Sequence, residues 1–187
     1  LSLSAIVALA LGIGLTTTMF SIVYVAVLKG LPFEDADELV ALFRNRPAQG
    51  VQFMGVSIHD FQDWRRQQAS FEDIAAYYAE TVNVGGTEGQ PIRYLGAYAS
   101  AHLFDVLRVR PILGRTFRPE EDHPSTPPVM ILSYRAWQDR FQGDPGIVGR
   151  TVILERRPFT VVGVMPPAFA LPDPGVQVWI PWHVPAD

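Results

Sequence analysis

The sequence predicts an α+β protein, in which one transmembrane helix precedes a mixed α/β domain. The first 28 residues contain no charged side chain. After them, short runs rich in β-branched and aromatic residues alternate with runs whose apolar residues recur every three or four positions, as in strands and helices. The irregular order of these runs favours a mixed α+β domain over a regular, doubly wound one.

The composition of the 187 residues narrows the class of protein. A hydrophobic fraction of 48% can supply a core. A net charge of −4 lacks the basic excess of a nucleic-acid binder, so we expect no nucleic-acid partner. Because the chain has no cysteine, disulfides, thiolate nucleophiles and cysteine-bound zinc are excluded. The chain opens on Leu1 rather than Met, so we expect it to be a piece of a longer protein.

The uncharged segment LSLSAIVALALGIGLTTTMFSIVYVAVL is the strongest single signal. As a helix, residues 5–28 would be about 36 Å long, and a bilayer's hydrocarbon core is about 30 Å thick. The alternatives are a buried helix, which rarely stays uncharged for so long, and a signal peptide, which should be shorter and end at small residues. We therefore predict a transmembrane helix within residues 1–29.

The flanks and faces of this helix support two further expectations. An acidic stretch (EDADE, 34–38) follows the helix. Under the positive-inside rule this flank places residues 30–187 on the extracytoplasmic side. Ser4, Ala8 and Gly12 recur every fourth position, so they form a helix-packing face that another helix can approach closely.

The first elements of the domain are predicted from propensity and capping. ELVALFR (38–44) is predicted to be a strand. The segment 57–68 is predicted to be a helix, capped by Ser57 with Asp60 reaching back. Residues 73–84 and 92–100 are predicted to be strands joined by a turn rich in glycine.

The middle of the chain continues the alternation. Ser100 is expected to cap a helix that ends near Leu107. The polar, proline-rich segment 118–128 is expected to be an exposed loop. A buried strand over 129–133 and a helix over 134–143 should follow.

The last elements are strands. Residues 151–165 are predicted to form two strands about the polar sequence ERRP. A strand cannot continue through Pro166 and Pro167, so the chain should leave the sheet at Met165. VQVWIPW (176–182) is predicted to be the final strand.

The sequence predicts no catalytic, cofactor or metal site. It has no phosphate-binding loop, and its four histidines lack metal-ligand spacing. His59 and Asp60 could line an acid–base site, but neighbouring helical positions face different directions, and a capping role for Asp60 is preferred. The tryptophans could form a ligand-stacking platform, but core packing explains them more simply. They are Trp64, Trp137, Trp179 and Trp182.

Several stretches in one order resemble a known family. They are DFQDWRRQQASFEDIAAY, LFDVLRVRPILGRTF, MILSYRAWQDRFQGDPGIVGRTVIL and PFTVVGVMPPAFALP. Together they resemble the periplasmic core domain of ABC-transporter permeases of the MacB and FtsX type, in particular the large-permease branch of soil bacteria. The resemblance runs from LALGIG to VWIPW, and so covers nearly the whole chain. One departure is Leu15-Thr16, where relatives often have Ala-Asn.

The resemblance implies an architecture and a function. Residues 1–29 would be the first transmembrane helix, and residues 30–187 a MacB-like periplasmic core domain that stops at Asp187 before its last elements. The chain would be a non-enzymatic permease segment in the inner (cytoplasmic) membrane. Its periplasmic domain would transmit conformational change for export or other extracytoplasmic work.

The implied partners are the other transmembrane helices of the permease, an ATP-binding cassette ATPase subunit or domain, and a second protomer in a dimeric assembly. Two alternatives stay open. One is the extracytoplasmic ligand-sensing domain of a membrane-anchored bacterial receptor, and the other is an anchored periplasmic hydrolase. Further spans downstream would favour the permease, whereas a single second span followed by a kinase would favour the receptor.

Overall fold

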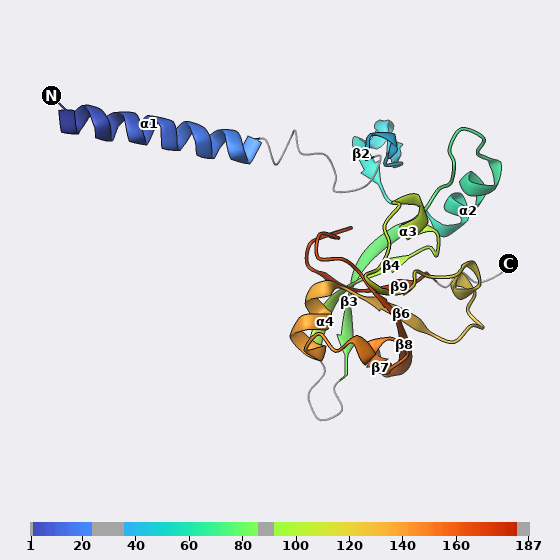
Figure 1. The fold of residues 1–187 in the computed structure, drawn as a ribbon. Helices are drawn as coiled ribbons and strands as arrows, with labels where there is room; N and C mark the ends of the chain where they lie inside the picture. Colours follow the sequence, from blue (N-terminus) through green and yellow to red (C-terminus); the bar gives the residue numbers. More distant parts are fainter. Residues whose placement is uncertain (1, 24–35, 86–91, 183–187) are drawn as a thin grey trace. The chain divides into compact units, whose positions relative to one another are not determined.

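The computed structural model describes residues 2–23, 36–85 and 92–182 (Figure 1). The chain forms two compact units, Leu1–Val40 and Ala41–Asp187. The first unit contains helix α1 (Ser2–Val23) and the 3-10 helix η2 (Ala36–Glu38). The sequence predicts that the transmembrane helix ends at residue 29 and the periplasmic domain begins at residue 30. The division into two compact units does not test this boundary.

Two threonine hydroxyls of helix α1 bond to the helix's own backbone. The Thr16 hydroxyl donates to the Gly12 carbonyl and the Thr18 hydroxyl donates to the Gly14 carbonyl, each at 2.8 Å. Such bonds satisfy a hydroxyl without water. No helix in the described part of the chain meets the length and apolarity that crossing a bilayer requires. The expected span over 5–28 is therefore not shown, and its residues 24–28 lie outside the described residues.

The second unit contains nine strands and three helices among the described residues. The strands are β1 (Arg44–Arg46), β2 (Val51–Met54), β3 (Tyr77–Val84), β4 (Ile92–Ala99), β5 (Leu113–Gly114), β6 (Val129–Leu132), β7 (Thr151–Leu154), β8 (Arg157–Val164) and β9 (Val176–Pro181). The helices are α2 (Ile58–Gln67), α3 (Leu103–Val106) and α4 (Tyr134–Phe141). Short 3-10 helices are η3 (Pro47–Gln49), η4 (Pro119–Asp122) and η5 (Pro145–Ile147). The predicted mixed α+β class is confirmed.

Strands β1 and β2 form a separate two-stranded sheet, and the other seven form one sheet in the order β5-β8-β6-β9-β4-β3-β7. Strand β7 pairs with β8 along its length and also meets β3, where Val84 lies opposite Leu154. The ends of the sheet therefore meet, and six strands form a ring with β5 attached to β8. The sheet is mixed, because β4 pairs with β9 in parallel and β3 pairs with β4 antiparallel.

The two faces of this sheet have different cores. In β9, Val178 and Ile180 belong to the main hydrophobic cluster, together with Ala136 of α4. Ser133 caps α4 by accepting from the Ala136 N–H at 3.0 Å, so this helix begins where the sequence predicts. Because successive strand residues alternate, Trp179 points to the other face. There it packs against the buried rings of Phe104 and Phe169, and Phe104 also contacts Phe117.

The predicted pair of strands over 151–165 is confirmed and has a tight turn. Leu154 lies opposite Arg157, so only Glu155 and Arg156 form the connection. Their φ angles are +47° and +64°. Two consecutive positive φ angles are typical of the two-residue turn that matches the twist of a hairpin. At the far end, the Met165 N–H donates to the Leu132 carbonyl at 2.9 Å before the chain leaves the sheet, as predicted.

Three local expectations were wrong. Residues 39–43 form no strand, and β1 begins only at Arg44, where β2 supplies a ladder partner. The Ser100 hydroxyl does not cap a helix, because it accepts from the distant Ala76 N–H at 3.0 Å, and α3 is a single turn. The segment 118–128 is not simply an exposed loop, because it contains η4, in which Glu121 is buried.

Candidate functional site

The predicted helix-packing face lies on α1, whose helical backbone brings positions 4, 8 and 12 to one side. The side chains of Ser4 and Ala8 lie outside what the structure describes. At Gly12, an added Cβ would meet no atom within 4 Å. A close-packed partner for this face therefore stays a prediction.

Of the two residues considered for acid–base chemistry, Asp60 has a structural role at the start of α2. The Ser57 hydroxyl accepts from the Asp60 N–H at 3.2 Å and caps α2, as predicted. The Asp60 carboxylate accepts from the Ser57 hydroxyl at 2.7 Å and from Arg44 Nη1 at 2.6 Å. The Asp60 side chain therefore reaches back to the Ser57 hydroxyl rather than to the Ser57 backbone N–H. His59 is exposed, and no group of three His, Asp or Glu side chains in the described ranges could hold a metal.

The most developed polar cluster of the second unit surrounds η4, in the segment expected to be an exposed loop. We call this cluster the acidic-turn junction. Its six side chains come from α2, the loops before β3 and after β5, the start of α3, and η4. They are Arg65, Asp73, His102, Arg115, Glu121 and Asp122.

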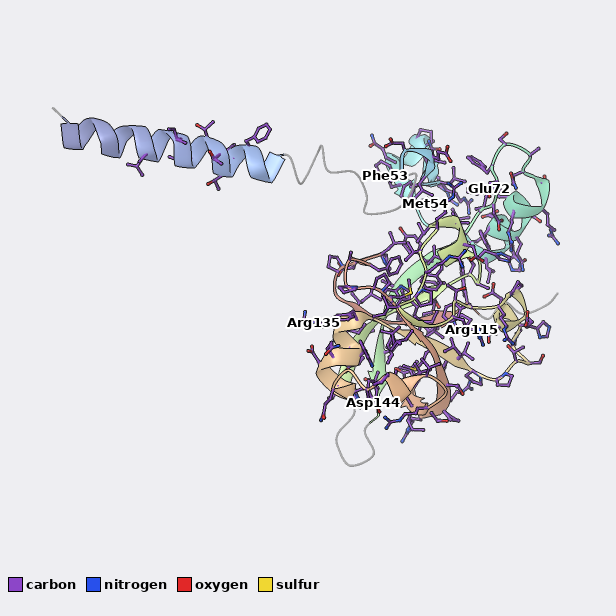
Figure 2. The ribbon with its side chains drawn as sticks, viewed as in Figure 1. Phe53, Met54, Glu72, Arg115, Arg135 and Asp144 are labelled. Carbon is purple, nitrogen blue, oxygen red and sulfur yellow. The ribbon has the colours of Figure 1, made fainter. Side chains whose placement is uncertain are left out.

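Glu121 is the buried anchor of the acidic-turn junction, with an exposure of 7%. Arg115, labelled in Figure 2, donates to both carboxylate oxygens of Glu121, from Nη1 at 2.9 Å and Nη2 at 2.6 Å. The Arg118 N–H adds a bond at 2.8 Å. Burial by itself would raise the pKa of Glu121, but these bonds outweigh burial and lower it. Glu121 is thus a paired carboxylate that holds η4 against the loop after β5.

The pKa of the Asp122 carboxyl is shifted in the opposite direction from that of Glu121. The two Asp122 carboxylate oxygens share one donor, the Ala101 N–H, at 2.8 and 3.0 Å. Burial raises the pKa of Asp122 to about 6, because this bond and the nearby charges of His102 and Arg65 offset only part of the desolvation. The Asp122 carboxylate therefore changes charge in mildly acidic solution, while it connects η4 to the start of α3.

Asp73 completes the acidic-turn junction. It accepts from Arg65 Nε at 2.9 Å and Nη2 at 3.1 Å, and His102 Nδ1 lies 3.5 Å from its Oδ2. Burial would raise the pKa of Asp73, but the Arg65 bonds and the Ile74 N–H lower it overall. Helix α2 is thus connected electrostatically to the loop before β3 and to the start of α3.

A layer of aromatic rings connects α2 to the sheet independently of these charges. Phe61 of α2 stacks on Trp182 with ring centroids 6.0 Å apart. Tyr78 lies edge-on to Trp182 at 5.4 Å and stacks on Tyr98 at 4.9 Å. Core packing is confirmed for Trp179, which is fully buried, whereas Trp64, Trp137 and Trp182 are half-buried.

The acidic-turn junction and the aromatic layer together make a set of fixed connections between surface segments and the sheet. Carboxylates paired with arginine or a backbone N–H hold segments in place. The junction was not predicted, because the polar, proline-rich composition of 118–128 indicates an exposed loop. A signal was present: Pro119 followed by three carboxylates is typical of the first turn of a helix.

Comparisons with solved structures support the fold. The chain is 20% identical to the periplasmic region of MacB from Actinobacillus actinomycetemcomitans, with a TM-score of 0.54 over 75% of this chain and 63% of that chain. It is 16% identical to the extracellular domain of the noncanonic ABC-type transporter YknZ from Gram-positive bacteria, with a TM-score of 0.55 over 68% of this chain and 63% of that chain. At these identities the likeness shows the fold alone, and the chain spans less than two thirds of either structure.

No curated protein matches the chain significantly. The family model of the MacB-like periplasmic core domain, in contrast, matches residues 2–185. Its match begins in α1 and continues beyond β9, so it includes every element described above. The resemblance of the sequence motifs to this family is confirmed, and the chain belongs to the MacB-like periplasmic core domain family.

Proposed function

We propose that this chain is a permease segment of an ABC transporter, in which the second unit transmits movement between membrane helices and the extracytoplasmic space. The single observation that carries this proposal is the family match over residues 2–185. The two solved structures that share the fold are a periplasmic region and an extracellular domain, which agrees with a location outside the cytoplasmic membrane.

The proposal includes the finer features predicted from the sequence. Residues 1–29 form a transmembrane helix in the inner membrane, and residues 30–187 lie on the extracytoplasmic side. The uncharged first 28 residues support the helix, and the acidic flank after them supports the orientation. The partners are an ATP-binding cassette ATPase, the other permease helices and a second protomer. Membership of the large-permease branch of soil bacteria is part of this proposal.

The structure of the second unit fits a part that moves as one body. The six-stranded ring is closed, and the acidic-turn junction and the aromatic layer fix α2, α3 and η4 to it. A tightly connected body transmits displacement without being deformed itself. We therefore expect movement of the whole second unit rather than movement of strands within it.

The test follows distances in the full-length permease with its ATPase, reconstituted in a bilayer. These 187 residues contain no cysteine, so after replacement of any cysteine elsewhere in the permease, spin labels can be placed on Arg135→Cys of each protomer, where the side chain is 79% exposed. ATP should shift the distance between these two labels. A matched pair within one protomer, Arg135→Cys with exposed Thr151→Cys, should keep its distance. No ATP-dependent shift between protomers would refute the transmission mechanism.

The ligand-sensing receptor remains the second candidate, supported by the extracytoplasmic location alone. It predicts label movement upon addition of a small ligand in the absence of any ATPase. Protease added to intact spheroplasts tests the topology on which both candidates depend. Cleavage is expected in the exposed part of 118–128, at residues 123–125 after η4, and protection until lysis would reverse the orientation.

A further inference from the structure

In the described part of the chain, one side chain joins the turn after η4 to the start of α3 by hydrogen bonds. We call residues 122–127 the outer turn. Asp122 accepts from the Ala101 N–H through both carboxylate oxygens, at 2.8 and 3.0 Å. The turn is also closed on itself, because the Thr126 N–H and hydroxyl both donate to the His123 carbonyl, at 3.1 and 2.6 Å. It can therefore leave α3 as a preformed unit when the Asp122 contact breaks.

Both ends of the outer turn are fixed independently of that contact. Before the turn, buried Glu121 keeps its two bonds to Arg115, so η4 stays in place. After it, the Pro128 carbonyl accepts from the Thr160 N–H of β8 at 3.0 Å. The sequence of the turn, DHPSTP, contains no large apolar side chain that would hold it in the core. Release of Asp122 would thus move the outer turn alone and leave the ring intact.

The charges around Asp122 leave it without a counter-charge in neutral solution. The charged or titratable groups around it are Arg65 of α2, Asp73 in the loop before β3, His102 at the start of α3 and Glu121 of η4. Arg65 is paired with Asp73 through two bonds. Glu121 is likewise paired with Arg115. While His102 is neutral, Asp122 is therefore the one carboxylate of the acidic-turn junction without a paired cation.

A proton can remove this imbalance in two ways. On Asp122 it removes the charge and leaves a carbonyl oxygen that still accepts from the Ala101 N–H. On His102, whose Nδ1 lies 3.5 Å from Asp73 Oδ2, it adds a cation at the start of α3. Both protonations act in the same direction, because each strengthens the contact between the outer turn and α3 as the pH falls.

We propose that the acidic-turn junction is a pH-sensitive latch, which holds the outer turn on α3 in mildly acidic solution and releases it in neutral solution. The raised pKa of Asp122, about 6, agrees in sign. The closed junction binds the proton more tightly than an open one with a solvated carboxyl, so the contact is strongest below about pH 4 and weakens as the pH rises to about 6. That the latch meets the pH of the external medium rests on the proposed function, whereas the latch itself does not.

The test is amide hydrogen exchange of the full chain in detergent micelles, followed by nuclear magnetic resonance. The Ala101 N–H reports the latch, because it donates to Asp122 and its residue is buried. After correction for the intrinsic exchange rate, the fraction of open junction should be about five to ten times larger at pH 7.5 than at pH 5.

A second amide separates local release from global unfolding. The Ser133 N–H donates to the Gln177 carbonyl at 2.8 Å and reports opening of the sheet. Urea below the unfolding transition should speed exchange at Ser133 and leave exchange at Ala101 unchanged, because release of the outer turn exposes little surface. This comparison uses the natural protein, so it does not depend on the folding of any variant.

Three substitutions identify the proton site. Asp122→Asn should abolish the pH dependence at Ala101, because asparagine keeps an oxygen acceptor but carries no charge. His102→Gln should keep the direction of the dependence, because Asp122 still titrates. Asp105→Asn, at an exposed position of α3, is the matched control and should keep the dependence in full.

The outcomes that would overturn the latch are specific. Equal open fractions at pH 5 and pH 7.5 in the natural protein would do so, as would a pH dependence that survives Asp122→Asn. An Ala101 amide that responds to urea as strongly as Ser133 would show that the contact breaks only when the whole unit unfolds, and would also overturn it. The transport proposal is decided separately, by the ATP-dependent label distances.

Discussion

Replacing Asp122 by asparagine should make the protein more stable at neutral pH, contrary to the usual effect of removing a carboxylate from an ion-paired cluster. The pKa of Asp122 is raised from 3.8 to about 6 in the folded protein. The folded state therefore binds a proton more tightly than the unfolded state, and stability falls as the pH rises from about 4 to about 6. Above about pH 6, the buried Asp122 charge lowers the free energy of unfolding by a constant amount.

The magnitude follows from the shift. Two pKa units correspond to about 3 kcal/mol at 1.36 kcal/mol per unit, and the partial exposure of Asp122 reduces this to about 1–2 kcal/mol. The asparagine side chain would keep an oxygen that accepts from the Ala101 N–H, so the hydrogen bond survives while the charge is removed. We expect Asp122→Asn to raise the free energy of unfolding by about 1–2 kcal/mol at pH 7.5. The corresponding rise in Tm is about 2–8 °C.

The assay is urea unfolding of the detergent-solubilised chain, followed by tryptophan fluorescence between pH 3.5 and 8. Trp179 is buried among phenylalanines and so reports on the core. The difference between Asp122→Asn and the natural protein should become small near pH 3.5, where Asp122 is protonated in the folded state and mostly protonated in the unfolded state. Asp105→Asn, at an exposed position of α3, is the matched control and should have little effect. A destabilised Asp122→Asn at pH 7.5, or an unchanged difference across the pH range, would refute the reasoning.

Three further predictions concern other contacts. Glu121→Gln should lower the free energy of unfolding by about 1–3 kcal/mol at neutral pH, because it breaks the bidentate pair between buried Glu121 and Arg115. The partial exposure of Arg115 limits this loss. Since the pKa of Glu121 is lowered, this loss should shrink as the pH falls below about 4.5 in the same unfolding assay. Gly163→Ala should destabilise by about 1–3 kcal/mol in urea unfolding, because its Cβ would clash with the Arg115 carbonyl oxygen. Gly12→Ile should impair assembly of the full-length permease, measured by size-exclusion chromatography, more than Ile6→Phe on a different side of α1. Equal tolerance at both positions would remove the packing proposal.

Local signals in the sequence predicted most of the second unit. Ser57 and Ser133 cap the helices that the periodicity predicts, because the cap and the first turn lie within four residues of each other. The strands over 77–84 and 92–99 carry enough β-branched and aromatic residues to be recognised, and they pair with each other. Such elements depend on neighbours that are close in the sequence.

The errors occur where distant residues decide the outcome. Residues 39–43 have strand propensity, but no strand pairs with them in the described part of the chain. Serine is a common helix-capping residue, yet the Ser100 hydroxyl accepts from the N–H of Ala76, 24 residues earlier. The closure of the ring between β3 and β7 has no local signal, because Val84 and Leu154 are far apart in the sequence. Contacts of this kind are set by the tertiary fold.

The closure of the ring has a mechanical consequence. Strand β7 meets β3 through a single paired position, supplemented by Glu155, whose carboxylate accepts from the Asn83 backbone and side chain. Strand β9, in contrast, is bonded to β4 on one side and to β6 on the other. A pull along β9 loads two rows of hydrogen bonds in shear, whereas a pull that spreads β3 from β7 loads only a few. Under tension, the β3–β7 contact would separate before the centre of the sheet yields.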